Sequence, residues 1–461
     1  MNHFPRFRSA LRAWAFRLWD DMKHDVSSVR TLAYVPSRSG GDAIGTLIDL
    51  PPQRWPDKYN SGAFYLPEWA EVVKAWHEDE HLKAHYMSLV GWAGMRSAVV
   101  EPELGFAFWP TMRLAAHWRI GCDPKDVRDQ EFTILYEPVE QFFADEHREI
   151  VVLLPLSGLV TDGPCELEKG VVLDRFDRDE IQLLVNRGII SGRFGSSITA
   201  DNVEEAQRHG LRRNVRVQKI VGDAIDLDEA EELARILSQP SDDRLRILRS
   251  LACCLDEAVI PQPFVGRTLG WNPGGGERGS PSPIFPYSGW GVSKALLTRG
   301  DHDSMRRMWA AFGQPTFEQS GSLRIAVDRI AWRGTRPSSI DVLVDVAIAS
   351  EAFFRSGEPQ NIRPSKGQKV ESSSARVKRR AAEYIDGFDY SMNSEEVRLF
   401  FHAAFEIRNQ VVHRGEHPSV VLDGRGTSLE FSEFVERYAA LMRRALLRHL
   451  TEREIPESPS W

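Results

Sequence analysis

The strongest constraint on how this chain can fold is the helical spacing of apolar residues in its C-terminal third. Segment 323–332 places its apolar side chains on one helix face, at Leu323, Ala326, Val327, Ile330 and Ala331. Helical segments are also expected at 305–312, 337–354, 373–385, 394–412 and 428–451. Short polar links separate most of them, and Gly415 and Pro418 are expected to end the helix over 394–412. This pattern predicts an all-helical bundle over residues 301–455.

The region before the bundle mixes strand and helix signals. Residues 149–156 are β-branched and aliphatic, which predicts a buried strand, and alternation over 165–173 predicts a second one. Asp177, followed three residues later by Glu180, predicts a capping box that starts a helix over 178–186. Further helices are expected at 1–28, 66–92, 226–237 and 242–258. The chain is therefore expected to be α+β overall, with an α+β region followed by the all-α bundle.

The expected organisation is a series of successive regions. Residues 1–145 form a helical and loop-rich region, particularly loop-rich over 36–66, and residues 146–260 form the α+β region. Segment 261–300 is rich in Pro, Gly and Ser, so we expect a linker or surface loop. Its stretch 271–279 lacks the terminal Gly-Lys-Ser/Thr of a phosphate-binding loop.

Charge and cysteine content limit the partners and the compartment. The net charge of −8 means that RNA binding requires a local basic patch, and Arg376, Lys378, Arg379 and Arg380 are the candidates. The alternative is that this run is a solvated helix face. The four cysteines form no C-x-x-C pair, and no zinc site or other cofactor is expected. The longest apolar stretch, 150–160, is too short to span a membrane, so we expect a cytoplasmic protein with reduced thiols.

The residues most suggestive of chemistry lie near the end of the segment 394–412. Arg408 and His413 are separated by about 140° of rotation and about 7.5 Å of rise on a helix. Arg408 falls on the apolar side with Ala404, Phe405 and Val412, where a guanidinium must be paired or line a cleft. Arginine suits a phosphate, and histidine can transfer protons near neutral pH. The alternative is that both cations only stabilise a helix C-terminus.

Segments 341–354, 376–382 and 405–415 together resemble the Apea-like group of the HEPN superfamily. The first carries Asp341, Asp345 and Glu351 on an aliphatic helix, the second is rich in arginine and alanine, and the third contains Arg-Asn-x-x-x-His. Ser350 departs from the family, which usually has leucine there, and the loop 356–369 is long and polar. The resemblance covers about a third of the chain.

The resemblance implies a metal-independent RNA endonuclease of a defence or toxin type. Arg408 and His413 would then be catalytic, and Asn409 would orient the site. Glu351 is either catalytic or a structural ion-pair partner of Arg408 or Arg379. RNA, including tRNA, is the expected substrate, cleaved through its own 2′-hydroxyl.

We expect a homodimer that does not associate with membranes, and the sequence does not identify any neutralising or triggering partner. The alternative function is a non-catalytic module of the same superfamily that binds RNA or partner proteins.

Overall fold

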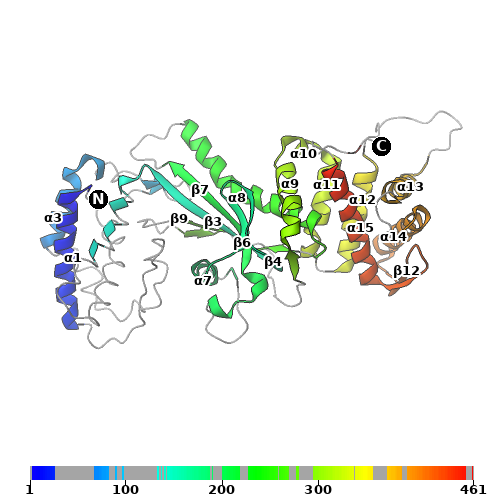
Figure 1. The fold of residues 1–461 in the computed structure, drawn as a ribbon, viewed down its shortest axis with the longest axis horizontal. Coiled ribbons are helices and arrows are strands. Elements are labelled where there is room, and N and C mark those ends of the chain that lie inside the picture. Colours follow the sequence, from blue (N-terminus) through cyan, green and yellow to red (C-terminus); the bar gives the residue numbers. More distant parts are fainter. Residues whose placement is uncertain are drawn as a thin grey trace. The chain divides into compact units, whose positions relative to one another are not determined.

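The computed structural model describes residues 3–25, 67–82, 89–90, 96–97, 132–133, 136–137, 140–141, 143–186, 189–190, 200–218, 227–257, 259–268, 277–279, 294–336, 338–356, 371–386, 392–452 and 459 (Figure 1). The chain divides into two compact units, and each is built from separated segments. The first comprises residues 1–153, 213–239 and 264–280, and the second comprises 154–212, 240–263 and 281–461. This interleaving differs from the successive regions predicted from the sequence.

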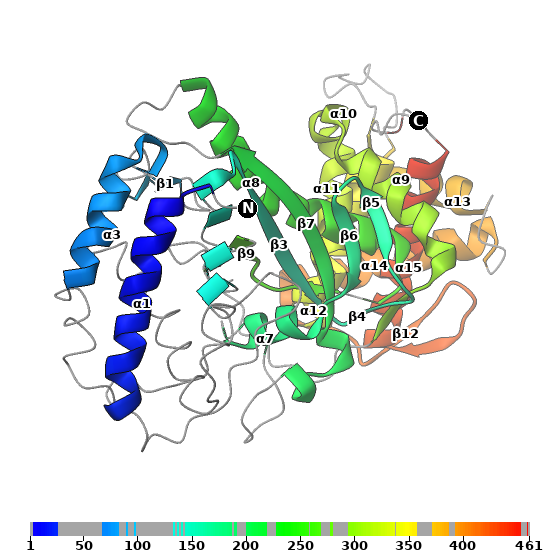
Figure 2. The same cartoon turned by 60° about the vertical axis from the view of Figure 1, so that its left-hand side comes forward.

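In the first unit, helices α1 (Pro5–Asp25) and α3 (Pro67–Glu78) lie side by side (Figure 2). Aromatic rings join them: Phe7 contacts Trp76 at 5.5 Å and Trp14 contacts Trp69 at 4.9 Å between centroids. The helix predicted over 1–28 is confirmed. The helix predicted over 66–92 is too long, because α3 ends at Glu78 and the short strand β1 (Leu89–Val90) pairs with β2 (Arg96–Ser97). The predicted loop 36–66 lies outside the described residues.

Strand β3 (His147–Ser157) confirms the buried strand predicted over 149–156. The unit boundary falls within this strand, after Leu153. In the first unit, β3 pairs antiparallel with β9 (Val265–Thr268), which also pairs with β10 (Glu277–Gly279). Beyond Leu153, β3 pairs with β8 (Ile260–Pro261). The segment predicted as a linker or surface loop therefore contributes strands, because β3 supplies hydrogen-bonding partners far away in the sequence.

Strand β7 (His209–Gln218) also crosses the unit boundary, after Arg212, and the sheet continues with β6 (Val171–Arg175) and β5 (Cys165–Glu168) of the second unit, in the order β3-β7-β6-β5. The single strand predicted over 165–173 is wrong. Gly170, at a φ of 78°, allows a turn between β5 and β6. A further parallel pair joins β4 (Leu159–Thr161) to β11 (Ala295–Leu297), again within the segment predicted as a linker.

Two helical predictions in this middle region had opposite outcomes. Helix α7 (Arg178–Asn186) begins as predicted, with the Asp177 and Glu180 side chains each accepting the other's main-chain N–H at 2.8 Å. The two helices expected on either side of Pro240 are instead one helix, α8 (Leu227–Cys254). Proline removes one main-chain donor, yet the helix continues, since Ile247 and Leu251 are buried and hold its second half in place.

The C-terminal part of the second unit is a layered group of helices (Figure 1). They are α9 (His302–Phe312), α10 (Pro315–Gln319), α11 (Gly321–Ala331), α12 (Ser339–Phe354), α13 (Ser373–Asp386), α14 (Ser394–Arg414) and α15 (Phe431–Thr451). Ser338 caps α12, whereas Pro337, the predicted helix start, lies outside the described residues. The core contains many aromatic side chains, including Phe353, Phe354, Phe401, Phe434 and Tyr438.

A small hairpin departs from the all-helical expectation. Strands β12 (Val420–Leu422) and β13 (Ser428–Glu430) pair antiparallel, so α15 begins at Phe431 rather than at Ser428. The turn closes because the Asp423 carboxylate accepts from the main-chain N–H groups of Arg425 and Thr427. The chain as a whole combines helices and strands, as the predicted α+β class requires. Among the described helices, none has both the length and the apolar character needed to cross a membrane.

Candidate functional site

Helix α14 carries the Arg-Asn-x-x-x-His residues and is fixed at both ends. Asn393 and Glu396 form a capping box at its start, a local signal that the sequence analysis missed. At its end, Gly415 adopts a left-handed φ of 70°, as expected for a helix C-terminus. Between these ends, one face of α14 is buried in the bundle core, mainly through Val397, Phe400, Phe401, Ala404 and Phe405. The helix therefore holds its last turns in a defined position.

Arg408 lies one turn beyond Ala404 on the buried face of α14 and is itself partly buried. Its Nη1 donates to Asn409 Oδ1 at 3.1 Å. Its Nε is shielded from solvent and has no acceptor among the described residues. Val412, which was expected to share the apolar side, is 50% exposed because the last turns of the helix extend past the core. Arg408 thus presents an unused N–H donor at the edge of the core.

Glu351 forms neither of the ion pairs considered from the sequence, at least within the described part of the chain. Arg379 pairs instead with Glu371 and Glu383, and none of the described carboxylates lies within ion-pair distance of Arg408. Glu351 is partly exposed near the end of α12. A structural role as an ion-pair partner of Arg379 or Arg408 is therefore not seen.

The charges of Glu351 and Arg408 both act on one buried tyrosine, Tyr438. Tyr438 of α15 is fully buried, and its hydroxyl lies 2.7 Å from Ser350 Oγ on α12. Burial raises the pKa of the Tyr438 phenol, and the Ser350 hydrogen bond lowers it. The Glu351 charge raises the same pKa, and the Arg408 charge lowers it. Sequence reasoning missed Tyr438, because a tyrosine on an apolar helix face resembles ordinary core.

His413 is exposed in the last turn of α14, well round the helix from Arg408. Among the described residues, it makes no hydrogen bond or ion pair, and it does not contact Arg408. Asn409 is also exposed, and its Oδ1 accepts from Arg408 Nη1. A single copy of the chain therefore places the arginine and the histidine on different sides of one helix end.

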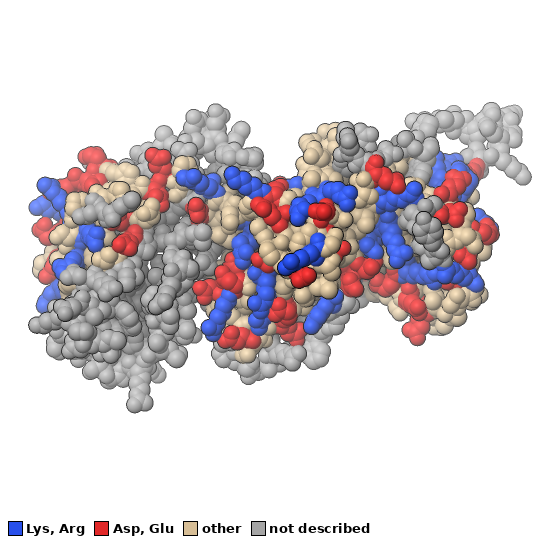
Figure 3. Space-filling model, viewed as in Figure 1, with Lys and Arg blue, Asp and Glu red and all other residues tan. Residues whose placement is uncertain are grey.

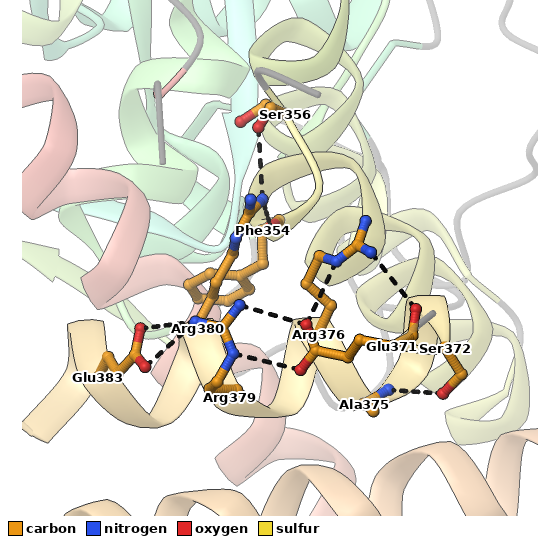
Figure 4. Close-up of polar contacts among 9 residues, drawn as sticks. All are labelled: Phe354, Ser356, Glu371, Ser372, Ala375, Arg376, Arg379, Arg380 and Glu383. Atoms are coloured by element: carbon orange, nitrogen blue, oxygen red, sulfur yellow. Dashed lines mark hydrogen bonds and ion pairs between the residues drawn. The ribbon is translucent and has the colours of Figure 1, made fainter. Parts of the chain in front are cut away.

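The basic run on α13 is largely engaged by other protein groups (Figure 4). Arg376 and Arg379 both pair with Glu371, and Arg379 also pairs with Glu383. Arg380 donates to the Phe354 and Ser356 main-chain oxygens, which cap the end of α12. Lys378 donates to His402 Nδ1 at 3.3 Å. Within the described structure, each of these four cations therefore has a protein partner with which an RNA phosphate would compete.

The Glu383 pairing could have been anticipated from its position four residues after Arg379, whereas Glu371 precedes the helix and gave no such signal. On the face shown in Figure 3, basic and acidic side chains are likewise intermixed.

The other histidines near the motif have local roles. His402 accepts from Lys378, and the His417 ring stacks on Phe431 with centroids 4.5 Å apart. Within the described ranges, no group of three or more His, Cys, Asp or Glu residues is arranged to hold a metal ion. The comparisons with known proteins do not add to these observations: no protein-family model, curated protein or solved structure matches this chain.

Proposed function

We propose that this chain is an RNA endonuclease of the HEPN type, with a role in defence or as a toxin, that cleaves through the 2′-hydroxyl of its substrate. The observation that supports this most is the Arg408 side chain. It is partly buried, has no carboxylate partner among the described residues, and has an Nε donor without an acceptor. Keeping such a cation at the edge of a core has a free-energy cost, which an anionic substrate would offset.

The chemistry follows from the residue types. The Arg408 guanidinium would bind the scissile phosphate and stabilise the charge that develops on it. His413, exposed and without partners in the described structure, would remove the 2′-hydroxyl proton or protonate the leaving 5′-oxygen. Asn409 would orient the arginine, because its Oδ1 accepts from Arg408 Nη1. The 2′-oxygen bonds to phosphorus as the bond to the 5′-oxygen breaks, which gives a cyclic phosphate and a 5′-hydroxyl.

A homodimer is part of this proposal. Arg408 and His413 point away from one another in one copy, so a complete site requires a second copy facing the first. Light scattering should then give about twice the 52.3 kDa mass of the chain. A monomer with full activity at nanomolar concentration would exclude this arrangement.

The function is tested by incubating the full chain with total RNA and tRNA, in a buffer of near-neutral pH that contains EDTA. His413→Ala should lose cleavage, while His402→Ala, another exposed histidine on α14, should retain it. RNA with one 2′-deoxy substitution at the cut site should resist, because its nucleophile is missing. Products with 5′-phosphates, or activity that requires added Mg²⁺, would refute the proposal. Binding without cleavage would favour the alternative of a non-catalytic module that binds RNA or partner proteins. The net charge of −8 is the observation that favours this alternative.

A further inference from the structure

The hairpin of β12 and β13 turns one row of main-chain groups away from the ladder. Ser419 and Asp423, which flank β12, hydrogen-bond to the β13 side of the hairpin through their main-chain groups, at 3.0 and 2.9 Å. Bonded and unbonded residues alternate along an antiparallel strand, so Val421 also directs its main-chain groups toward β13. The N–H and C=O groups of Val420 and Leu422 therefore point to the outer edge of the hairpin.

This outer edge of β12 is open in the described structure. No strand other than β13 pairs with β12, and no other described part of the chain hydrogen-bonds to the main-chain groups of Val420 or Leu422. Their side chains face solvent as well, since Val420 is 51% and Leu422 is 64% exposed. The hairpin lies at the margin of the C-terminal helices (Figures 1 and 2). An open edge with apolar side chains is a template for pairing with another strand.

The open edge is complementary to a second copy of itself. When two β12 strands pair antiparallel about a two-fold axis at Val421, Val420 of each copy lies opposite Leu422 of the other. All the outward main-chain groups of these two residues are then used, in four intermolecular hydrogen bonds. Pro418 has no N–H, so the edge offers no further donor on that side.

The side chains on the exposed face fit the same arrangement. The two copies of Val420 and Leu422 would form a continuous apolar centre. Glu430 is the β13 neighbour of Val420, and Ser428 is the β13 neighbour of Leu422, so both lie outside this centre. The two Glu430 carboxylates fall at opposite corners and do not face one another. An apolar centre with a polar rim is the usual composition of a protein–protein interface.

We propose that the β12 edge is a contact between two copies of this chain, which joins their hairpins into one four-stranded antiparallel sheet. It names the surface for the homodimer that the proposed function requires, and in that respect it rests on that function, whereas the pairing geometry does not. The contact is well below the standard interface size, so the dimer should dissociate in the micromolar range.

The first test is sedimentation velocity on the full chain, from nanomolar to tens of micromolar concentration. The mass should rise from 52.3 kDa toward twice that value. Leu422→Lys places a charge on each edge and should raise the dissociation constant at least roughly 10-fold. Leu399→Lys is the matched control, because this leucine of α14 is also exposed, at 40%, and should leave dimerisation unchanged.

Val420→Pro tests the main-chain bonds separately from the apolar contact. Proline removes the outward N–H of residue 420 in each copy, and with it two of the four intermolecular hydrogen bonds, while the bonds to β13 remain. The dissociation constant should rise again, with a melting temperature close to that of the unsubstituted chain.

The register is tested with cysteines. A Val420→Cys chain mixed with a Leu422→Cys chain places the two thiols on opposite residues, about 5.5 Å apart between Cα atoms, which a disulfide can bridge. Either variant alone offers only the diagonal pair, beyond about 7 Å, and should cross-link far less under the same oxidant. The unsubstituted chain gives the background from the native cysteines.

The interface is wrong if the unsubstituted chain stays at 52.3 kDa throughout, or if Leu422→Lys dimerises as tightly as that chain. It is also wrong if the mixed cysteine variants cross-link no more than each does alone.

RNA cleavage on the same samples separates the interface from the proposed function. Cleavage by a chain that stays monomeric would refute the interface and leave the endonuclease. A dimer that depends on Leu422 but does not cleave RNA would support the interface and refute the endonuclease. Cleavage that is lost in Leu422→Lys and returns at higher protein concentration would support both.

Discussion

Replacing Arg408 with methionine should stabilise the bundle while abolishing RNA cleavage. Methionine keeps the apolar stem of the side chain, which packs beyond Ala404, and removes the guanidinium. The lost interactions are small, because the one hydrogen bond that the guanidinium makes among the described residues goes to exposed Asn409. The gain is removal of a shielded Nε donor that has no acceptor in the described part of the chain.

An unsatisfied buried donor costs about 1–3 kcal/mol, and we use the lower end because Arg408 is only partly buried. Arg408→Met should therefore raise the stability of this region by about 1 kcal/mol. Hydrogen exchange of α14 amides in the native protein measures this locally, which avoids assuming that both units unfold together. Cleavage is measured on the same samples.

Arg437→Met provides the matched control. Arg437 pairs at 2.7 Å with the fully buried Asp423 carboxylate, so its loss should destabilise the bundle by about 3–5 kcal/mol. If Arg408→Met instead destabilises α14 by about 2 kcal/mol or more, Arg408 has a structural role that this reasoning overlooks.

Two further predictions concern stability. Burial lowers the pKa of His209 below its usual 6.5, and its Nδ1 accepts from Thr161 N–H, which requires the neutral ring. As the pH falls below about 6.5, the unfolded chain binds the proton more readily than the folded chain, so the free energy of unfolding decreases. Between about pH 7.5 and 5.5, urea unfolding should show a smaller decrease in His209→Gln than in the unsubstituted chain. An equal decrease in the free energy of unfolding of both proteins would contradict this. In Gly424→Ala, the new Cβ would lie 1.9 Å from Glu396 O, so the free energy of unfolding should fall by about 1–3 kcal/mol. Gly415→Ala is the control: the φ at this position is 70° and no described atom lies within 4 Å of the new Cβ, so the free energy of unfolding should fall by about 1 kcal/mol. A larger decrease in Gly415→Ala than in Gly424→Ala would be inconsistent with the predicted clash between the Gly424→Ala Cβ and Glu396 O.

The sequence by itself determined the features that depend on neighbouring residues. Asp177 and Glu180 are three positions apart, so their capping box could be identified without knowing what α7 packs against. Gly415 ended α14 for an equally local reason, since glycine adopts a positive φ easily. Helical periodicity likewise located α11, α13 and α14 closely, because the spacing of apolar residues directly reflects which side of a helix is buried.

The tertiary structure decided what depends on residues far apart. Strand β9 occurs in a Pro- and Gly-rich segment because it pairs with β3, more than a hundred residues earlier, and β10 then pairs with β9. The basic run at Arg376–Arg380 was correctly placed on a helix, but local sequence could not show that Glu371 and the end of α12 engage it. In the same way, the sequence located Arg408 and His413, and only packing showed that Arg408 retains an unused donor at the edge of the core. The physical reason is that periodicity and capping act between adjacent turns, whereas strand pairing and charge neutralisation depend on which groups the completed fold brings within a few ångströms.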